Sequence, residues 1–100
     1  MIIYLAGKIT GNPEYRKQFA AAKAKLKAKG HIVLNPAELP EGMSPDAYMR
    51  ICFAMIDTAD WICGVGGWRQ SRSARIETSY ADYIGKPIHN LDDVLEGWFE

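Results

Sequence analysis

The chain has 100 residues, of which 48% are hydrophobic and 24% are charged, a composition typical of one globular domain rather than a disordered segment. Its twelve basic and twelve acidic residues give a formal net charge of zero, which argues against nonspecific binding to nucleic acid or to an anionic membrane, because both depend on summed positive charge. No apolar run approaches the roughly 20 residues of a membrane helix, and the chain begins without a basic leader, so we expect a cytoplasmic protein.

The spacing of cysteines and histidines predicts neither a metal site nor a disulfide framework. Cys52 and Cys63 form no Cys-x-x-Cys pair, and His31 and His89 lie far from both in the sequence; known metal and disulfide patterns need closer or more numerous ligands. We therefore expect two reduced thiols inside the protein, and neither a metal ion nor another cofactor.

Basic residues are concentrated between Arg16 and Lys29. Residues 1–50 carry eight Lys or Arg and four Asp or Glu, and the second half of the chain has the opposite balance. One interpretation is a basic stripe that binds an anionic ligand. The other, which we favour, is the solvated face of an amphipathic helix with cations toward its C-terminus.

The first half of the chain opens with a strand and a helix. The apolar run Met1–Ala6, ended by Gly7, predicts a buried strand. Asn12 is expected to cap a helix with Pro13 at its first position. Apolar residues then recur at helical spacing until Gly30 ends the helix.

A second strand is predicted over His31–Leu34, and a proline-containing loop follows over residues 35–42. Ser44 is expected to begin a second helix that runs to about Ala59. The apolar segment Trp61–Val65 then predicts a third strand.

The last part of the chain predicts a third helix, a short strand and a terminal helix. Ser71 or Ser73 caps the third helix, and its expected core stripe is Ile76, Tyr80 and Ile84. The remaining predicted features are the end of this helix at Gly85, a fourth strand that starts at Pro87–Ile88 and a terminal helix over Asp92–Phe99.

This alternation of strands and helices, with short connections, predicts an α/β fold. We expect one doubly wound domain over residues 1–100, built in three layers around a parallel, flavodoxin-like sheet of four to five strands. Ligands of such sheets bind outside the carboxyl ends of the strands. The loops at residues 7–12, 35–45 and 66–73 are therefore the expected surroundings of a site.

Glu77 is the strongest candidate for chemistry. It follows the loop after the third strand and lies beside the predicted apolar stripe, where burial can tune the pKa of a carboxylate. The hydroxyl of Tyr4, in the first strand, can reach the same crevice. The alternatives are that Glu77 only favours the dipole at the start of its helix and that Tyr4 is an ordinary core residue.

A second candidate is an anion site at the start of the third helix. Ser71 and Ser73 offer hydroxyls next to the free amides of the helix terminus, and Arg69, Arg72 and Arg75 are close in sequence. Amides, hydroxyls and guanidinium groups together suit a phosphate. The alternative is ordinary helix capping with exposed arginines.

Three segments resemble the nucleoside 2-deoxyribosyltransferase superfamily. Tyr4–Gly11 resembles its opening strand and loop, and the segment from Gly67 to Glu77 resembles its signature helix. The Asn35–Leu39 loop and the Gly-Trp-x-x-Ser spacing are similar to a small branch found in bacteria and phages, related to 2′-deoxynucleoside 5′-phosphate N-hydrolases. The resemblance covers roughly residues 1–88.

This resemblance implies chemistry at the N-glycosidic bond of a nucleoside or nucleotide. Glu77 matches the nucleophile, which attacks the anomeric carbon and displaces the base, and Tyr4 matches the tyrosine that orients it. Ser71 stands where the nucleotide hydrolases of this superfamily have serine and the nucleoside transferases an acid. The implied substrate-binding residues are Gly7, Lys8, Ile9, Trp68, Ser71 and Ser73.

One departure from the superfamily concerns the second helix. Related sequences carry an aspartate in a Tyr-Met-Arg-x-Asp context, where it helps to bind the sugar and to transfer protons, and this chain has Cys52 there. Asp57 is the nearest candidate to replace it in catalysis, although five residues along a helix turn it about 140° out of phase.

Two functional hypotheses follow. The first is an N-glycosidase or deoxyribosyltransferase with a small nucleoside or nucleotide substrate, favoured by Tyr4 and Glu77. The alternative is a nucleotide-binding module of the same fold that does not cleave its ligand, favoured by Cys52. We also expect a homodimer or larger homo-oligomer, since the chain is rich in aromatic residues and the superfamily completes its site across a subunit boundary.

Overall fold

The computed structural model describes residues 1–97 and contains a parallel sheet between two pairs of helices. The strand order is β2-β1-β3-β4, and every pair is parallel, which confirms the predicted α/β fold with four strands. The strands are β1 (Ile2–Ala6), β2 (Ile32–Leu34), β3 (Trp61–Gly64) and β4 (Ile88–Asn90), and the α-helices are α1 (Tyr15–Ala28), α2 (Pro45–Thr58), α3 (Arg72–Tyr83) and α4 (Leu91–Leu95).

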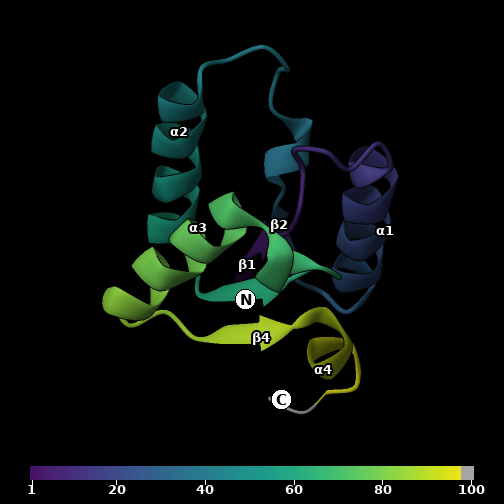
Figure 1. The fold of residues 1–100 in the computed structure, drawn as a ribbon. Helices are drawn as coiled ribbons and strands as arrows, with labels where there is room; N and C mark the ends of the chain where they lie inside the picture. Colours follow the sequence, from purple (N-terminus) through teal and green to yellow (C-terminus); the bar gives the residue numbers. More distant parts are fainter. Residues whose placement is uncertain (98–100) are drawn as a thin grey trace.

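The two faces of the sheet bury separate cores. Helices α1 and α4 cover one face and α2 and α3 the other (Figure 1). Because side chains alternate along a strand, β1 sends Ile3 and Leu5 to the first core and Tyr4 to the second. β1 lies between β2 and β3, so Tyr4 comes to lie at the centre of the sheet, fully buried.

Helix α3 packs on the sheet through small side chains. Its buried residues are Ala74, Glu77, Thr78 and Ala81. Two of the three residues of the predicted stripe were therefore wrong, because Ile76 is 44% exposed and Ile84 39% exposed. The third, Tyr80, is partly buried and packs against the second core. Small residues allow the helix to approach the sheet closely, and this brings the face that carries Glu77 inward.

Two other predicted boundaries also differ. Helix α1 begins at Tyr15 and not at Pro13, because Asn12 accepts a hydrogen bond from the Glu14 amide and gives its own side-chain amide to Lys8 and Gln18, which keeps the chain in a turn. The terminal helix α4 starts one residue early and ends at Leu95. The rest of the predicted terminal helix at residues 98–99 lies outside the described residues.

Short 3-10 helices over Pro36–Glu38 and Trp68–Gln70 interrupt the two long loops at the carboxyl end of the sheet. Among residues 1–97, none of the helices combines the length and the apolar character that a membrane span requires. In the same part of the chain, no three His, Cys, Asp or Glu side chains gather closely enough to bind a metal ion.

Candidate active site

Strand β1 and helix α3 bring Tyr4 and Glu77 together across 73 residues of sequence. The Tyr4 hydroxyl donates a hydrogen bond of 2.6 Å to Oε1 of Glu77. Tyr4 is fully buried and Glu77 is only 4% exposed. The carboxylate therefore lies inside the protein with one strong donor, an arrangement that is rare for a purely structural glutamate.

Burial controls the protonation of both groups. It raises the pKa of Glu77 to about 7, although the hydrogen bond from Tyr4 acts in the opposite direction. Burial, and then the neighbouring charge of Glu77, raise the pKa of Tyr4 well above its usual value. Tyr4 thus stays a donor near neutral pH, while Glu77 exchanges its proton in that range.

Helix α2 adds Cys52 and Tyr48, one helical turn apart, to Tyr4 and Glu77. We call these four side chains the buried cluster. The Cys52 thiol is fully buried and faces the hydroxyls of Tyr4 and Tyr48. Burial raises its pKa to about 11, so it is a neutral thiol at pH 7. Sequence reasoning missed Tyr48, although its position four residues before Cys52 places both on one side of a helix.

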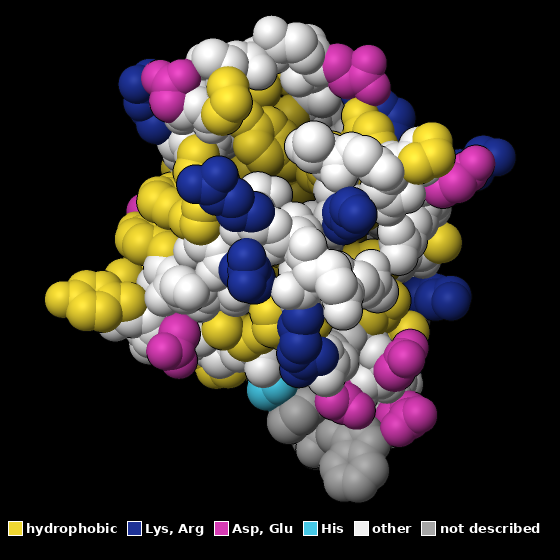
Figure 2. Space-filling model, in the orientation of Figure 1, with side chains coloured by type: hydrophobic (Ala, Val, Ile, Leu, Met, Phe, Trp, Pro, Cys, Tyr) yellow, Lys and Arg dark blue, Asp and Glu magenta, His cyan; other side chains and the backbone are white. Residues whose placement is uncertain are grey.

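A cavity of about 400 Å³ opens at the carboxyl end of the sheet, and Figure 2 shows it as a hollow with hydrophobic side chains inside. Tyr48 and Ser73 line it. Each stands one helical turn before a member of the buried cluster, Cys52 and Glu77 respectively, so the cluster lies beneath the cavity. The other lining residues are Ile9, Thr10, Tyr15, Pro36, Leu39, Pro40, Glu41, Gly42, Met43, Pro45 and Met49.

The start of α3 is rich in donors. Of the two predicted capping residues, Ser71 caps the helix: its hydroxyl accepts a hydrogen bond of 3.2 Å from the Ala74 amide. The same hydroxyl lies 3.2 Å from that of Ser73. Arg72 and Arg75 are exposed, and neither forms an ion pair within residues 1–97. The positive charge at this helix terminus is thus available to an anion.

Three residues of the loop after β1 were predicted to bind substrate: Gly7, Lys8 and Ile9. Ile9 lines the cavity, and Lys8 is exposed beside it without an ion pair to any described residue. Gly7 is required by packing, because a Cβ there would come within 2.8 Å of the Phe19 ring. The position of Gly7 thus has a structural explanation of its own.

Two predicted site residues lie elsewhere. Asp57 is exposed at the C-terminal end of α2 and accepts a hydrogen bond of 2.5 Å from the Tyr80 hydroxyl. It is thus at the opposite end of the helix from the cavity, and it does not replace Cys52. The Trp68 indole packs directly on Gly64, where any Cβ would collide with the indole ring. The indole Nε1 also donates a hydrogen bond of 3.1 Å to Asn90. Trp68 lines a different cavity, at the ends of β3 and β4.

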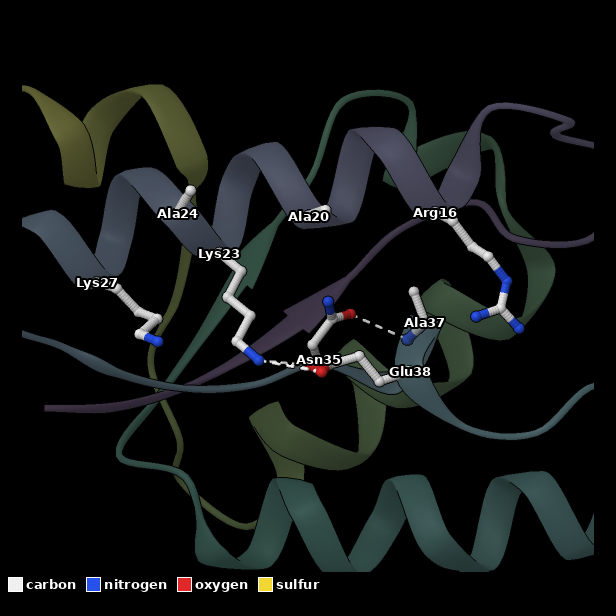
Figure 3. Close-up of a pocket in the computed structure, with 8 residues that line it drawn as sticks. All are labelled: Arg16, Ala20, Lys23, Ala24, Lys27, Asn35, Ala37 and Glu38. Carbon is white, nitrogen blue, oxygen red and sulfur yellow. Dashed lines mark hydrogen bonds and ion pairs between the residues drawn. The ribbon is translucent and has the colours of Figure 1, made fainter.

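The basic stripe on α1 lines a groove of about 460 Å³ against the loop after β2 (Figure 3). Lys23 forms an ion pair of 2.5 Å with Glu38. Arg16 forms another, of 3.3 Å, with Glu41. Two of the three basic side chains in the groove, the third being Lys27, are thus paired with carboxylates, which favours the interpretation of a solvated helix face.

Comparisons with known proteins agree with this architecture. Residues 1–90 match the family model described as Domain of unknown function (DUF4406). No protein with a curated function matches the sequence. The solved structures that share the fold include the CMP N-glycosidase BcmB of Clostridium botulinum, with a TM-score of 0.68, and a 2-deoxyribosyltransferase of Bacillus psychrosaccharolyticus, with a TM-score of 0.71.

Both neighbours are 24% identical to this chain and are matched over 90% of its length, which corresponds to 70% of the glycosidase and 71% of the transferase. The resemblance to the nucleoside 2-deoxyribosyltransferase superfamily is therefore confirmed at the level of the fold. The role of each side chain depends on the geometry described above.

Proposed function

The chain belongs to the family described as Domain of unknown function (DUF4406), and from this membership and a fold shared with an N-glycosidase and a deoxyribosyltransferase we propose that it cleaves or transfers the N-glycosidic bond of a nucleoside or nucleoside 5′-monophosphate. The observation that carries the proposal is the buried hydrogen bond of 2.6 Å between Tyr4 and Glu77. It holds one carboxylate oxygen in place beneath a cavity large enough for a small ligand.

In the proposed reaction, the ionised carboxylate of Glu77 attacks the anomeric carbon. A C–O bond forms while the bond to the base breaks, and the base leaves with the electron pair and takes up a proton. Water or a second base then attacks the glycosyl ester and restores the carboxylate. Tyr4 remains protonated throughout and fixes the direction of the attacking oxygen.

The start of α3 supports a phosphorylated substrate. The hydroxyls of Ser71 and Ser73, the helix amides and the exposed side chains of Lys8 and Arg72 provide donors and positive potential next to the cavity. A 5′-phosphate is the group of a nucleotide that such a helix terminus stabilises. We therefore place the phosphate of a monophosphate substrate at this terminus and its sugar above Glu77.

A second candidate function is nucleotide binding without cleavage. Cys52 favours it, because a neutral thiol stands where the superfamily resemblance implies a second carboxylate. A thiol with a pKa of about 11 is a poor acceptor and offers little acid–base assistance at pH 7.

One experiment separates the two functions. The protein is incubated with nucleosides and their 5′-monophosphates, and free base is measured by chromatography while binding is measured by calorimetry. We expect base release that Glu77→Gln lowers by at least about 10³-fold, because an amide cannot form the glycosyl ester. Glu38→Gln, an exposed carboxylate outside the cavity, is the matched control. Binding without any base release would instead support the binding module.

We also propose a homodimer. Helix α3 exposes Ile76 and Tyr83, the latter 90% exposed, and Ile84 is exposed directly after the helix. Large exposed apolar side chains are typical of interfaces between subunits. Light scattering at micromolar concentration should give about twice the 11.2 kDa mass of the chain. A purely monomeric mass would contradict this proposal without affecting the proposed reaction.

A further inference from the structure

The cavity above Glu77 carries a carboxylate, Glu41, that two neighbours hold in place. The Tyr15 hydroxyl donates a hydrogen bond of 2.8 Å to Oε1 of Glu41, and Nε of Arg16 donates to the same oxygen at 3.3 Å. The second oxygen, Oε2, forms no hydrogen bond within residues 1–97. These contacts join the start of α1 to the loop before α2 and leave one acceptor of Glu41 unused.

The charge of Glu41 determines what this acceptor can bind. The hydrogen bond from Tyr15, followed by the interactions with Arg16, lowers the pKa of the carboxyl below its usual value. Glu41 is therefore ionised at neutral pH, and an ionised carboxylate only accepts hydrogen bonds. A ligand group that meets Oε2 must be an N–H or O–H donor, and a group that presents lone pairs is repelled.

The position of Glu41 in the cavity indicates which part of a nucleotide it meets. Ser73 brings the cavity next to the start of α3, where the proposed function places the phosphate and the sugar. The rest of the lining is largely apolar and aromatic, with Tyr15, Leu39 and Met49 among its residues. Such walls suit the flat faces of a base. A sugar held above Glu77 directs its base into this space, toward the residues that surround Glu41.

We infer that this cavity is the base subsite and that Glu41, positioned by Tyr15 and Arg16, accepts a hydrogen bond from an exocyclic amino group of the base. The inference rests on the proposed function. It names the substrate class as nucleotides of amino-bearing bases, and it disfavours bases that present a carbonyl oxygen or a bare C–H at the same edge. Tyr15 and Arg16 are positioning residues for Glu41 and do not themselves need to touch the base.

The expected selectivity is moderate. Glu41 is 70% exposed in the free protein, so water and salt weaken its interactions until a ligand covers it. A hydrogen bond to a charged group that is only partly desolvated corresponds to roughly a tenfold difference in Kd. Larger selectivity would need a fully buried acceptor.

The test compares nucleotides that differ only in one amino group. Suitable pairs are guanosine and inosine 5′-monophosphates, which differ at the 2-amino group, and adenosine and purine riboside 5′-monophosphates, which differ at the 6-amino group. Calorimetric Kd values are measured on the full chain with Glu77→Gln, so that no base is released during titration. We expect the amino-bearing member of at least one pair to bind roughly tenfold more tightly.

The variants of Glu41 make the test specific. In Glu41→Gln the amide oxygen can stay with the Tyr15 and Arg16 donors, so the amide NH₂ takes the place of Oε2 and becomes a donor. The preference for the amino group should then disappear, and carbonyl-bearing bases should gain affinity. Tyr15→Phe keeps the ring but removes the hydroxyl that orients Glu41, and it should reduce the preference by a smaller factor. Glu38→Gln, on the adjacent turn but outside the cavity, should leave the preference unchanged.

The possible outcomes separate this inference from the proposed function. Equal Kd values within both pairs, or a preference that Glu41→Gln leaves intact, overturn the role of Glu41 while the glycosidic chemistry stands. If none of the four nucleotides binds, this inference fails, while base release from the wider set of nucleosides and 5′-monophosphates still decides the proposed function. A preference that Glu41→Gln removes and Glu38→Gln does not supports the inference.

Discussion

Polar groups gather in two regions of this molecule, and they are arranged in opposite ways. The groove on α1 holds Arg16, Lys23 and Lys27 at the surface, where Lys23 meets Glu38 in an ion pair. Among residues 1–97, the cluster beneath the cavity contains one carboxylate, Glu77, which is 4% exposed and accepts one short hydrogen bond, from Tyr4. The groove has more charged side chains, but the carboxylate of the cluster is far more deeply buried.

The difference between the two regions concerns what each charge gains from its surroundings. In the groove, solvent surrounds the basic groups and carboxylates pair with two of them, so their contribution to stability is small. In the cluster, burial works against the ionised form of Glu77 and one donor only partly offsets it. A protein that keeps such a carboxylate gives up stability, which is typical of functional sites.

The largest expected effect concerns Cys52, the thiol of the buried cluster. Cys52→Asp would add the second carboxylate that the superfamily resemblance implies, and acid–base assistance of this kind is worth about 10²–10⁴ in rate. We expect base release to rise by a factor in that range. A second carboxylate nearby raises the pKa of the first, so more base is needed to ionise Glu77. The assay is therefore run at pH 8, above the pKa of about 7 that Glu77 has in the wild type.

The control for this change is Cys63→Asp. Cys63 is equally buried but packs on the opposite face of the sheet, so an aspartate there should lower Tm without any gain in rate. A loss of Tm together with no gain in rate for Cys52→Asp would show that Cys52 is only a core residue.

The next effect is on stability and its dependence on pH. Glu77 has a pKa of about 7 in the folded protein, against an ordinary value of 4.5, so the folded state binds this proton more tightly than the unfolded state. Its contribution to the free energy of unfolding is complete below pH 4.5 and is lost as the pH rises through 7, by about 3 kcal/mol. Glu77→Gln should therefore be more stable than the wild type at pH 8 and similar to it at pH 4, as measured by urea unfolding.

Tyr4→Phe is the companion variant in this experiment. The hydrogen bond from Tyr4 lowers the pKa of Glu77, so its removal should shift the loss of stability, and the rise of activity, to higher pH. If the pH dependence of unfolding were the same in the wild type and in Glu77→Gln, the carboxylate would be ionised in the folded state without penalty, and the contrast with the groove would be wrong.

The sequence was sufficient to predict most of the fold. Alternating apolar runs and helical spacing, punctuated by Gly and Pro, located the four strands and the four α-helices that the structure describes within residues 1–97, and the short connections implied a parallel sheet. The sequence also predicted that Tyr4 and Glu77 reach the same crevice, because Glu77 follows the loop after the third strand and the superfamily resemblance marked both residues.

The failures have physical causes that lie in packing. On α3, Ile76 and Ile84 were predicted as core because they are apolar, but the sheet accepts only small residues at close approach, so Ala74 and Ala81 face it. Tyr48 was missed because an aromatic residue on an amphipathic helix carries no sign of whether its hydroxyl meets water or a buried thiol. Such choices depend on neighbours that are remote in sequence.

The smallest expected effect concerns the groove. Lys23→Gln removes the cation of the ion pair with Glu38, where the Lys23 side chain is 30% exposed and that of Glu38 55%. A pair this exposed contributes less than about 1 kcal/mol, and salt screens it. We therefore expect a change in Tm near the limit of measurement, no change in base release, and no difference between the variant and the wild type at 1 M salt. If Lys23→Gln instead reduced nucleotide binding several-fold at low salt, the groove would take part in recognising the anionic ligand, and the basic stripe would be a binding surface rather than a solvated helix face.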